Sequence, residues 1–338
     1  MNLIELKKID SMRMFEIYDM WPDIARKSYI KKYNKINYLG IKHIVFAGMG
    51  GSGALGDIFS SILSKTKIHV DVVKGYHLPK TINKNTLVVA ISISGNTEEI
   101  LKILRDARKL DCKLIAFASG GKMEKLCKNN KIEFRKIEKF HSPRASFPSF
   151  LYSILNILSP ILPIKKKDIL ESIKKLEKLE SLISSNNINE KNPSLKIAQW
   201  LVKTPLIYYP WGLQSVAIRF KNSLQENSKD HVVIEDVIES CHNGIVAWEK
   251  KSEIQPILIK GKDDHYKTKE KWKILAKYFI KNKIDYREIN SVDGNILSKI
   301  ICLIYLLDYC SIYKAVIEKI DPSPVKSIEY MKKKYKRY

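Results

Sequence analysis

Apolar and polar positions change period several times along the chain, and these changes predict strands and helices in turn. Short apolar runs rich in β-branched residues predict strands at 43–48, 68–73, 86–92 and 113–119. Segments with an apolar position every three to four residues lie between these runs and predict helices at 52–64, 96–109 and 123–129. Strands that alternate with helices indicate βαβ units, and therefore a parallel sheet with helices on both faces.

The second half of the chain repeats this alternation after a long stretch, 145–204, whose periodicity is mostly helical. Strands are then predicted at 205–210, 231–236, 255–261 and 284–289. The segment 296–317 is apolar on most faces, so we expect a helix that is buried or lies in an interface. We therefore predict an α/β fold with two halves, residues 1–160 and residues 161–338, of which the second begins with a helical connector.

Composition and cysteine content are those of a globular protein. The 338 residues are 45% apolar and 9% aromatic, which is too apolar for a disordered chain. No uninterrupted apolar run reaches the roughly 18 residues that span a membrane, and the N-terminus lacks the apolar core of a signal peptide. The five cysteines are odd in number and scattered, which favours reduced thiols. We expect a cytoplasmic protein with no membrane partner.

The chain is strongly basic, with 60 Lys and Arg residues against 36 Asp and Glu residues and a formal net charge of +24. Such a charge is found in proteins that bind nucleic acid, but here the lysines are spread from end to end. Most of the charge therefore reflects composition, and we expect no nucleic-acid partner. A minor share can help to attract an anionic substrate.

Hydroxyl side chains gather where the predicted strand 86–92 ends and the next helix begins. Ser92, Ser94 and Thr97 fall within six positions. The carboxyl ends of parallel strands bind ligands, and a helix N-terminus at that edge favours an anion. The three hydroxyls therefore predict a phosphate site. The alternative is that Asn96 or Ser94 simply caps the helix, but one cap needs only one hydroxyl.

A glycine-rich loop, FAGMGGSGALG at 46–56, follows the first predicted strand and opens the next helix. Glycines such as Gly51 let the backbone approach a ligand closely, and Ser52 can donate a hydrogen bond to it. A dinucleotide site would want an acidic residue at the end of the next strand. Lys74 follows that strand and Asp71 lies inside it, so the pattern favours a small phosphorylated ligand.

The stretches GMGGSGALGD and SISGNTEE resemble the sugar isomerase (SIS) domain. From about residue 40 onward the chain resembles the bifunctional phosphoglucose/phosphomannose isomerases, on the further stretches SPRASFPSFLYSIL, QENSKDHVVIEDVIESCHNG and DPSPVKSIEYMK. The resemblance implies two SIS-type subdomains, a phosphorylated hexose as substrate, and a homodimer with shared active sites. Fructose 6-phosphate would be interconverted with glucose 6-phosphate and mannose 6-phosphate through a cis-enediol(ate), with no metal and no cofactor.

The same resemblance assigns roles to individual residues. Glu226 would move the proton between C1 and C2, a task that suits a carboxylate within reach of both carbons. His242 and Lys332 would open the sugar ring, and Arg144 would stabilise the charge of the enediolate. The residues expected to bind the substrate phosphate are Gly51, Ser52, Ser92, Ser94 and Thr97.

Several alternatives stay open at this point. In the lysine-rich tail, Lys326, Lys333 and Lys334 are alternatives to Lys332, and His242 can act in its own subunit or in a partner. No His, Cys and Asp residues stand at metal-ligand spacing, in agreement with a metal-free site. A non-catalytic sugar-phosphate sensor and an isomerase of other specificity remain alternatives. The missing acidic ribose ligand disfavours a Rossmann-type oxidoreductase.

Overall fold

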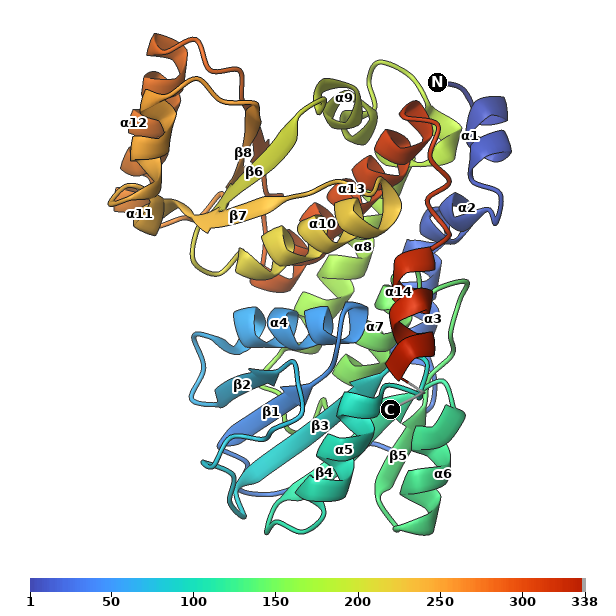
Figure 1. Ribbon diagram of the computed structural model, residues 1–338. Helices are drawn as coiled ribbons and strands as arrows, with labels where there is room; N and C mark the ends of the chain where they lie inside the picture. Colours follow the sequence, from blue (N-terminus) through green and yellow to red (C-terminus); the bar gives the residue numbers. More distant parts are fainter. Residues whose placement is uncertain (336–338) are drawn as a thin grey trace.

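The computed structural model describes residues 1–335 and contains two parallel sheets (Figure 1). The strands of the first sheet are β1 (His43–Ala47), β2 (His69–Val73), β3 (Thr86–Ser92), β4 (Lys113–Ala118) and β5 (Glu133–Lys136). They lie in the order β2-β1-β3-β4-β5, and every neighbouring pair is parallel. In this order the chain changes direction across the sheet between β1 and β3, and parallel sheets bind ligands at that point, outside the strands' carboxyl ends.

The second sheet repeats the topology of the first. Its strands are β6 (Thr204–Tyr209), β7 (Val233–Asp236), β8 (Ile254–Lys260) and β9 (Arg287–Asn290). The order β7-β6-β8-β9 is that of the first four strands of the first sheet, and all pairs are again parallel. The predicted α/β class with two parallel sheets flanked by helices is therefore confirmed.

The helices fall into four groups along the chain. Three precede the first sheet: α1 (Leu3–Ile9), α2 (Met14–Asp19) and α3 (Trp21–Ile30). The first half contains α4 (Gly51–Leu63), α5 (Glu98–Ala107), α6 (Gly121–Asn129) and α7 (Phe147–Ile157). The connector contains α8 (Lys166–Ile183), the short helix η1 (Ser185–Asn187) and α9 (Pro193–Trp200). The second half contains α10 (Gln214–Asn227), α11 (Val237–Ser240), η2 (Gly244–Glu249), α12 (Tyr266–Lys281), α13 (Ile296–Ile317) and α14 (Lys326–Tyr335).

One large hydrophobic core joins the two halves. It includes Ile44 of β1, Ile207 of β6 and Ile300 of α13, all fully buried. Between the sheets, α4 packs against α10, and α13 packs against α8, α9 and α10 (Figure 1). The predicted boundary between residues 160 and 161 falls in the turn between α7 and α8 and stays a prediction. The last three residues of the predicted second half lie outside the described residues.

Helix α13 is the expected apolar helix at 296–317, and its burial is confirmed. By length and composition it is the one helix among the described residues that would suffice to cross a membrane. However, 89% of its most apolar window is buried inside the protein. Its apolar faces are therefore accounted for by packing against neighbouring helices, as in the core helix of a globular protein.

Candidate active site

The loops after β1 and β3 meet at the point where the strand order reverses. The Oγ atom of Ser52 accepts a hydrogen bond from the backbone N–H of Ile93, at 3.1 Å. The first loop folds tightly, because a Cβ atom on Gly48 would lie 2.7 Å from the backbone of Ser52. Ser52 is buried and lies in the first turn of α4, which begins at Gly51. The two predicted phosphate loops are thus joined by a direct hydrogen bond.

The second loop gathers the remaining predicted hydroxyls. The Oγ atom of Ser92 and the Oγ1 atom of Thr97 share a hydrogen bond of 2.8 Å, and Ser94 Oγ accepts one from the N–H of Asn96 at 3.3 Å. Helix α5 begins at Glu98, so Thr97 is the N-cap residue, and its side chain makes no capping hydrogen bond. The alternative in which Asn96 or Ser94 caps the helix is therefore wrong.

Arg144 lies just before α7 and is almost completely buried, with 4% of its surface exposed. Its Nη1 donates to a carboxylate oxygen of Glu226 at 2.9 Å. Its Nη2 donates to the carbonyl oxygens of Pro322 and Ser323, at 2.6 and 3.0 Å. The Nε–H is buried and has no hydrogen-bond partner among the described residues, so the guanidinium retains a free donor.

Glu226 lies in the last turn of α10, and 27% of its side chain is exposed. One side of the carboxylate therefore faces Arg144 while solvent reaches the other. Just beyond the helix, Lys229 Nζ donates to the backbone oxygen of Glu226 at 2.5 Å and to that of Pro324 at 2.9 Å. Desolvation, followed by the charge of Arg144, lowers the pKa of Lys229 from its ordinary value. The lysine links the backbone around Glu226 to the C-terminal segment.

A second arginine, Arg219 of α10, holds the backbone at Arg144. Its Nε and Nη2 donate to Asp308 of α13, in an ion pair whose two side chains are 2% and 0% exposed. Burial opposes the charge of the guanidinium, but the carboxylate of Asp308 outweighs it and raises the pKa of Arg219. Arg219 Nη2 also donates to the backbone oxygen of Arg144 at 2.9 Å. The sequence interpretation missed both residues, because a single aspartate in an apolar helix gives no functional signal.

The C-terminal segment 321–324 closes one side of the site. Ser323 Oγ donates to Asp10 Oδ1 at 3.3 Å and lies 3.4 Å from His141 Nε2. Ser11 Oγ donates to Asp321 at 2.5 Å. Burial is the main cause that lowers the pKa of His141. Residues from both ends of the chain therefore hold the carbonyl groups that accept from Arg144.

His242 and Lys332 make no polar contact with Arg144 or Glu226 among the described residues of one chain. His242 lies just after α11 and is exposed, and Lys332 lies on the exposed helix α14, as do Lys326, Lys333 and Lys334. Within residues 1–335, no hydrogen bond or ion pair joins the side chain of His242 or Lys332 to Glu226 or Arg144. The structure thus brings Arg144, Glu226 and Gly51 together around Arg219, since a Cβ atom on Gly51 would lie 3.8 Å from Arg219 Nη1.

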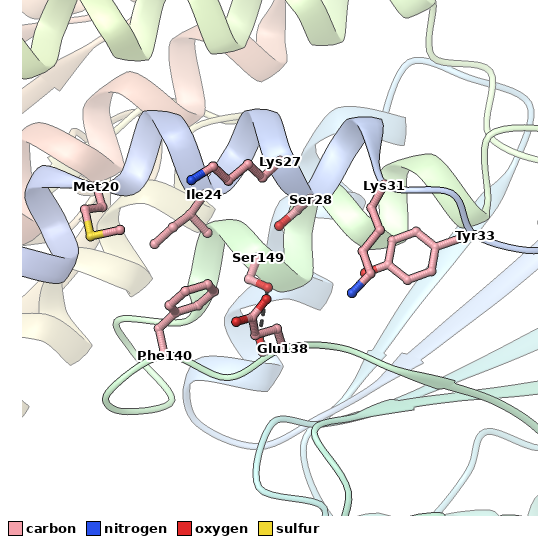
Figure 2. Close-up of a pocket in the computed structure, with 9 residues that line it drawn as sticks. All are labelled: Met20, Ile24, Lys27, Ser28, Lys31, Tyr33, Glu138, Phe140 and Ser149. Atoms are coloured by element: carbon pink, nitrogen blue, oxygen red, sulfur yellow. Dashed lines mark hydrogen bonds between the residues drawn. The ribbon is translucent and has the colours of Figure 1, made fainter.

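A small cavity lies elsewhere, between α3 and the segment that leads into α7 (Figure 2). Its volume is about 80 Å³, and its walls include Ile24, Phe140 and Ser149. Pockets that bind small organic ligands usually measure about 300 to 1,000 Å³. This cavity is too small for a hexose phosphate and contains none of the predicted site residues.

Comparison with known proteins agrees with the division of the fold into two similar halves. The SIS domain model matches residues 38–159, and the model described as the bacterial phospho-glucose isomerase C-terminal SIS domain matches residues 190–335. The bifunctional phosphoglucose/phosphomannose isomerase of Caldicellulosiruptor bescii is 32% identical over 334 residues, which cover 95% of this chain and 98% of the relative. That of Aquifex aeolicus is 29% identical and covers 94% of this chain and 95% of the relative.

Among solved structures, a hypothetical protein from Thermus thermophilus superposes with a TM-score of 0.74 at 13% identity. The match covers 98% of this chain and 93% of that protein. At this low identity the likeness supports the fold, while the sequence relatives carry the family assignment.

Proposed function

The chain belongs to the family of bifunctional phosphoglucose/phosphomannose isomerases, and on that premise we propose that it interconverts fructose 6-phosphate with glucose 6-phosphate and mannose 6-phosphate. Membership of this family makes it a phosphosugar isomerase. The observation that carries the proposed chemistry is the contact between Arg144 and Glu226, beside the two hydroxyl-rich loops. This contact places the carboxylate of Glu226, an acid–base group, next to the positive charge of Arg144, at the edge of the sheet where ligands bind.

The phosphate group is proposed to bind between the two loops. The N-terminus of α4 carries a partial positive charge that favours an anion, while the N–H of Ser52 in its first turn donates to the backbone oxygen of Met49 at 3.0 Å. Ser92 and Thr97 are hydrogen-bonded to each other, and they can exchange that bond for phosphate oxygens at little cost. Ser52 would keep the two loops in register through its bond to Ile93. This arrangement would fix the sugar with C1 and C2 toward Glu226.

Glu226 is proposed to transfer the proton between C1 and C2. When it removes the proton from C2 of glucose 6-phosphate, electrons move onto the C1 oxygen and a cis-enediolate forms. Once a proton has moved from O2 to O1, return of the carbon-bound proton to C1 gives fructose 6-phosphate. Return to the opposite face of C2, with the proton still on O2, gives mannose 6-phosphate. Arg144 would stabilise the enediolate, because its unpartnered Nε–H can donate to the new oxyanion. A positive group already present at this position supports a metal-free reaction.

The ring-opening groups are proposed to come from elsewhere in a homodimer. His242 is exposed and has no side-chain contact with Glu226 in its own chain among the described residues. We propose that a second copy of the chain brings His242 to the site, where it moves a proton at the ring oxygen. Lys332 would act with it, and Lys326, Lys333 and Lys334 remain the alternatives. Five free cysteines and such a substrate fit a cytoplasmic enzyme of glycolysis or gluconeogenesis.

The test is an assay of the purified, chelator-treated protein with fructose 6-phosphate. Separate coupled assays measure glucose 6-phosphate and mannose 6-phosphate, with Glu226→Gln as the inactive variant and Gln225→Ala, an exposed neighbour, as the matched control. Both products should form without added metal, and Glu226→Gln should lose activity about 10² to 10⁴-fold. Formation of glucose 6-phosphate alone would restrict the substrate range. Binding without turnover would indicate a sensor instead.

A further inference from the structure

Three neighbouring strands place polar side chains in one row at the amino edge of the first sheet. His43, His69 and Thr86 are the first residues of β1, β2 and β3, and the strand register pairs His43 with both of the others. Asp71 lies two residues beyond His69 on β2, so its side chain points to the same face of the sheet. Together with Asp71, the row forms a cluster of two imidazoles and one carboxylate, although 25 residues separate the histidines and no ligand spacing is visible in the sequence.

The separations in this cluster suit a metal ion. His43 Nε2 lies 2.9 Å from Asp71 Oδ2, and His69 Nε2 lies 3.6 Å from Asp71 Oδ1. One ligand atom can be chosen from each residue so that all three lie within 4.8 Å of one another. Ligand atoms around a tetrahedral zinc ion are about 3.4 Å apart, given bonds of about 2.0 to 2.1 Å. The two measured separations, which run to different oxygens of Asp71, lie on either side of that value.

His43 is also oriented as metal-binding histidines usually are. Its side chain is 9% exposed, and its Nδ1 lies 3.3 Å from Thr86 Oγ1, which accepts a further hydrogen bond from the N–H of Asn83. When Nδ1 carries the proton and donates to Thr86, the lone pair of Nε2 points toward Asp71. A hydrogen bond from the second ring nitrogen that fixes the tautomer is the usual support of a histidine ligand.

The charged groups around Asp71 also favour a metal site. The chain has 60 Lys and Arg residues, yet within the described part the ion-pair partners of Asp71 are the two histidines. A hydrogen bond that only stabilises the fold needs one histidine partner, whereas the carboxylate of Asp71 has two. His69 is 69% exposed and borders an open groove of about 430 Å³, which leaves room for water molecules to complete the coordination.

We propose that His43, His69 and Asp71 bind a divalent transition-metal ion of the zinc class. Two imidazoles and one carboxylate, with positions open to water, suit this class of ion. The site is separate from the proposed catalytic site. Ala47 lies four positions beyond His43 on β1, so the cluster lies roughly 13 Å from the end of the strand that carries the glycine loop. The ion would fasten the edge strand β2 to β1.

The test is a calorimetric titration of the full-length, chelator-treated protein with ZnCl₂ in chelator-free buffer. The unaltered protein should bind one zinc ion per chain. His69→Asn and Asp71→Asn should each weaken binding at least about tenfold. Both residues are partly exposed, so the variants should fold, and retained isomerase activity will show that they do. The matched controls are His231→Asn, an exposed histidine outside the cluster, and Cys241→Ser, a partly exposed thiol.

A second measurement uses CoCl₂, whose visible absorption reports ligation directly. The absorption should appear with the unaltered protein and the two controls, and should be lost in His69→Asn. Failure of the unaltered protein to bind zinc would overturn the proposal. So would binding that survives both His69→Asn and Asp71→Asn, because the ion would then occupy another part of the surface.

Discussion

Arg144 Nη1 and a carboxylate oxygen of Glu226 lie 2.9 Å apart, although 82 positions separate the two residues in the chain. The contact joins the entrance of α7 to the end of α10, and so connects the two halves at the candidate site. Its charge balance suits the proposed reaction. When Glu226 accepts a proton it becomes neutral, and Arg144 is then free to pair with the new oxyanion of the enediolate.

Replacement of Arg144 by lysine should reduce turnover sharply. A single ammonium group cannot reach Glu226 and the carbonyl groups of Pro322 and Ser323 with the fork geometry of a guanidinium. We expect kcat to fall about 10² to 10³-fold in Arg144→Lys, with a much smaller change in KM. Steady-state kinetics measure both constants, and Arg13→Lys, on the surface, is the matched control. A kcat close to that of the unaltered protein would contradict the assigned role.

Alanine substitutions in the two loops should affect stability and phosphate binding differently. Ser52→Ala leaves the buried N–H of Ile93 without an acceptor, which should lower the free energy of unfolding by about 1 to 3 kcal/mol. Ser94 is partly exposed and supports only the N–H of Asn96, so Ser94→Ala should raise KM with little loss of stability. Urea denaturation and steady-state kinetics on both variants measure the difference. Equal stability losses would show that Ser52 does not hold the loops together.

The ion pair between Arg219 and Asp308 should be essential for stability. Asp308→Asn leaves the guanidinium of Arg219 buried without a counter-charge, and loss of one member of a buried pair costs roughly 3 to 5 kcal/mol. Urea denaturation should therefore show a much lower midpoint. Asp106→Asn removes the partner of Lys102 in an exposed pair and should leave the midpoint unchanged. A midpoint for Asp308→Asn equal to that of Asp106→Asn would refute this expectation.

His141 should make the protein less stable in mild acid. Its pKa is lowered chiefly by burial, so the folded protein binds the proton less readily than the unfolded chain. The stability that the neutral ring provides is complete above the ordinary histidine pKa of about 6.5 and is lost as the pH falls from there through the lowered pKa of the folded state. The free energy of unfolding, measured by urea denaturation from pH 8 to 5, should fall less steeply in His141→Gln. An unchanged slope would argue against a partly buried neutral ring, and His231→Gln, at an exposed histidine, is the matched control.

Mixed dimers can show whether His242 acts in the partner subunit. Glu226→Gln and His242→Ala chains should each be inactive alone. If the base and the histidine come from different subunits, half of randomly mixed dimers contain one intact site of two, which restores about a quarter of the full activity. The measurement is activity after the two variants are unfolded and refolded together. Activity that does not rise above that of the separate variants would place both residues in one chain.

Regular elements were predicted well because their periodicity is local. The strand Thr86–Ser92 is fully buried and reads as a continuous apolar run, so sequence alone identified it. The strand Glu133–Lys136 was missed, because it is a four-residue edge strand, EFRK, in which charged residues outnumber apolar ones. Its pairing with β4 comes from the sheet and leaves no signature within the segment itself.

The site was predictable only where a local motif marks it. The glycine loop with Ser52, and the hydroxyl cluster with Ser92, each follow a strand, so their meeting at one sheet edge could be expected. Asp308 could not be identified, because its partner Arg219 is 89 positions away and the surrounding helix is apolar. The cluster of His43, His69 and Asp71 likewise depends on the register between β1 and β2, which no spacing in the sequence reveals.

The position of segment 321–324 in the chain affects when the protein can fold during its synthesis. Arg144 is synthesised early, but two of its acceptors belong to Pro322 and Ser323, close to the end of the chain. Ser323 in turn bonds with Asp10, near the beginning. A nascent or prematurely terminated chain that stops before residue 322 therefore carries a buried arginine with no carbonyl groups to receive it. Synthesis must therefore be nearly complete before these contacts around the candidate site can form.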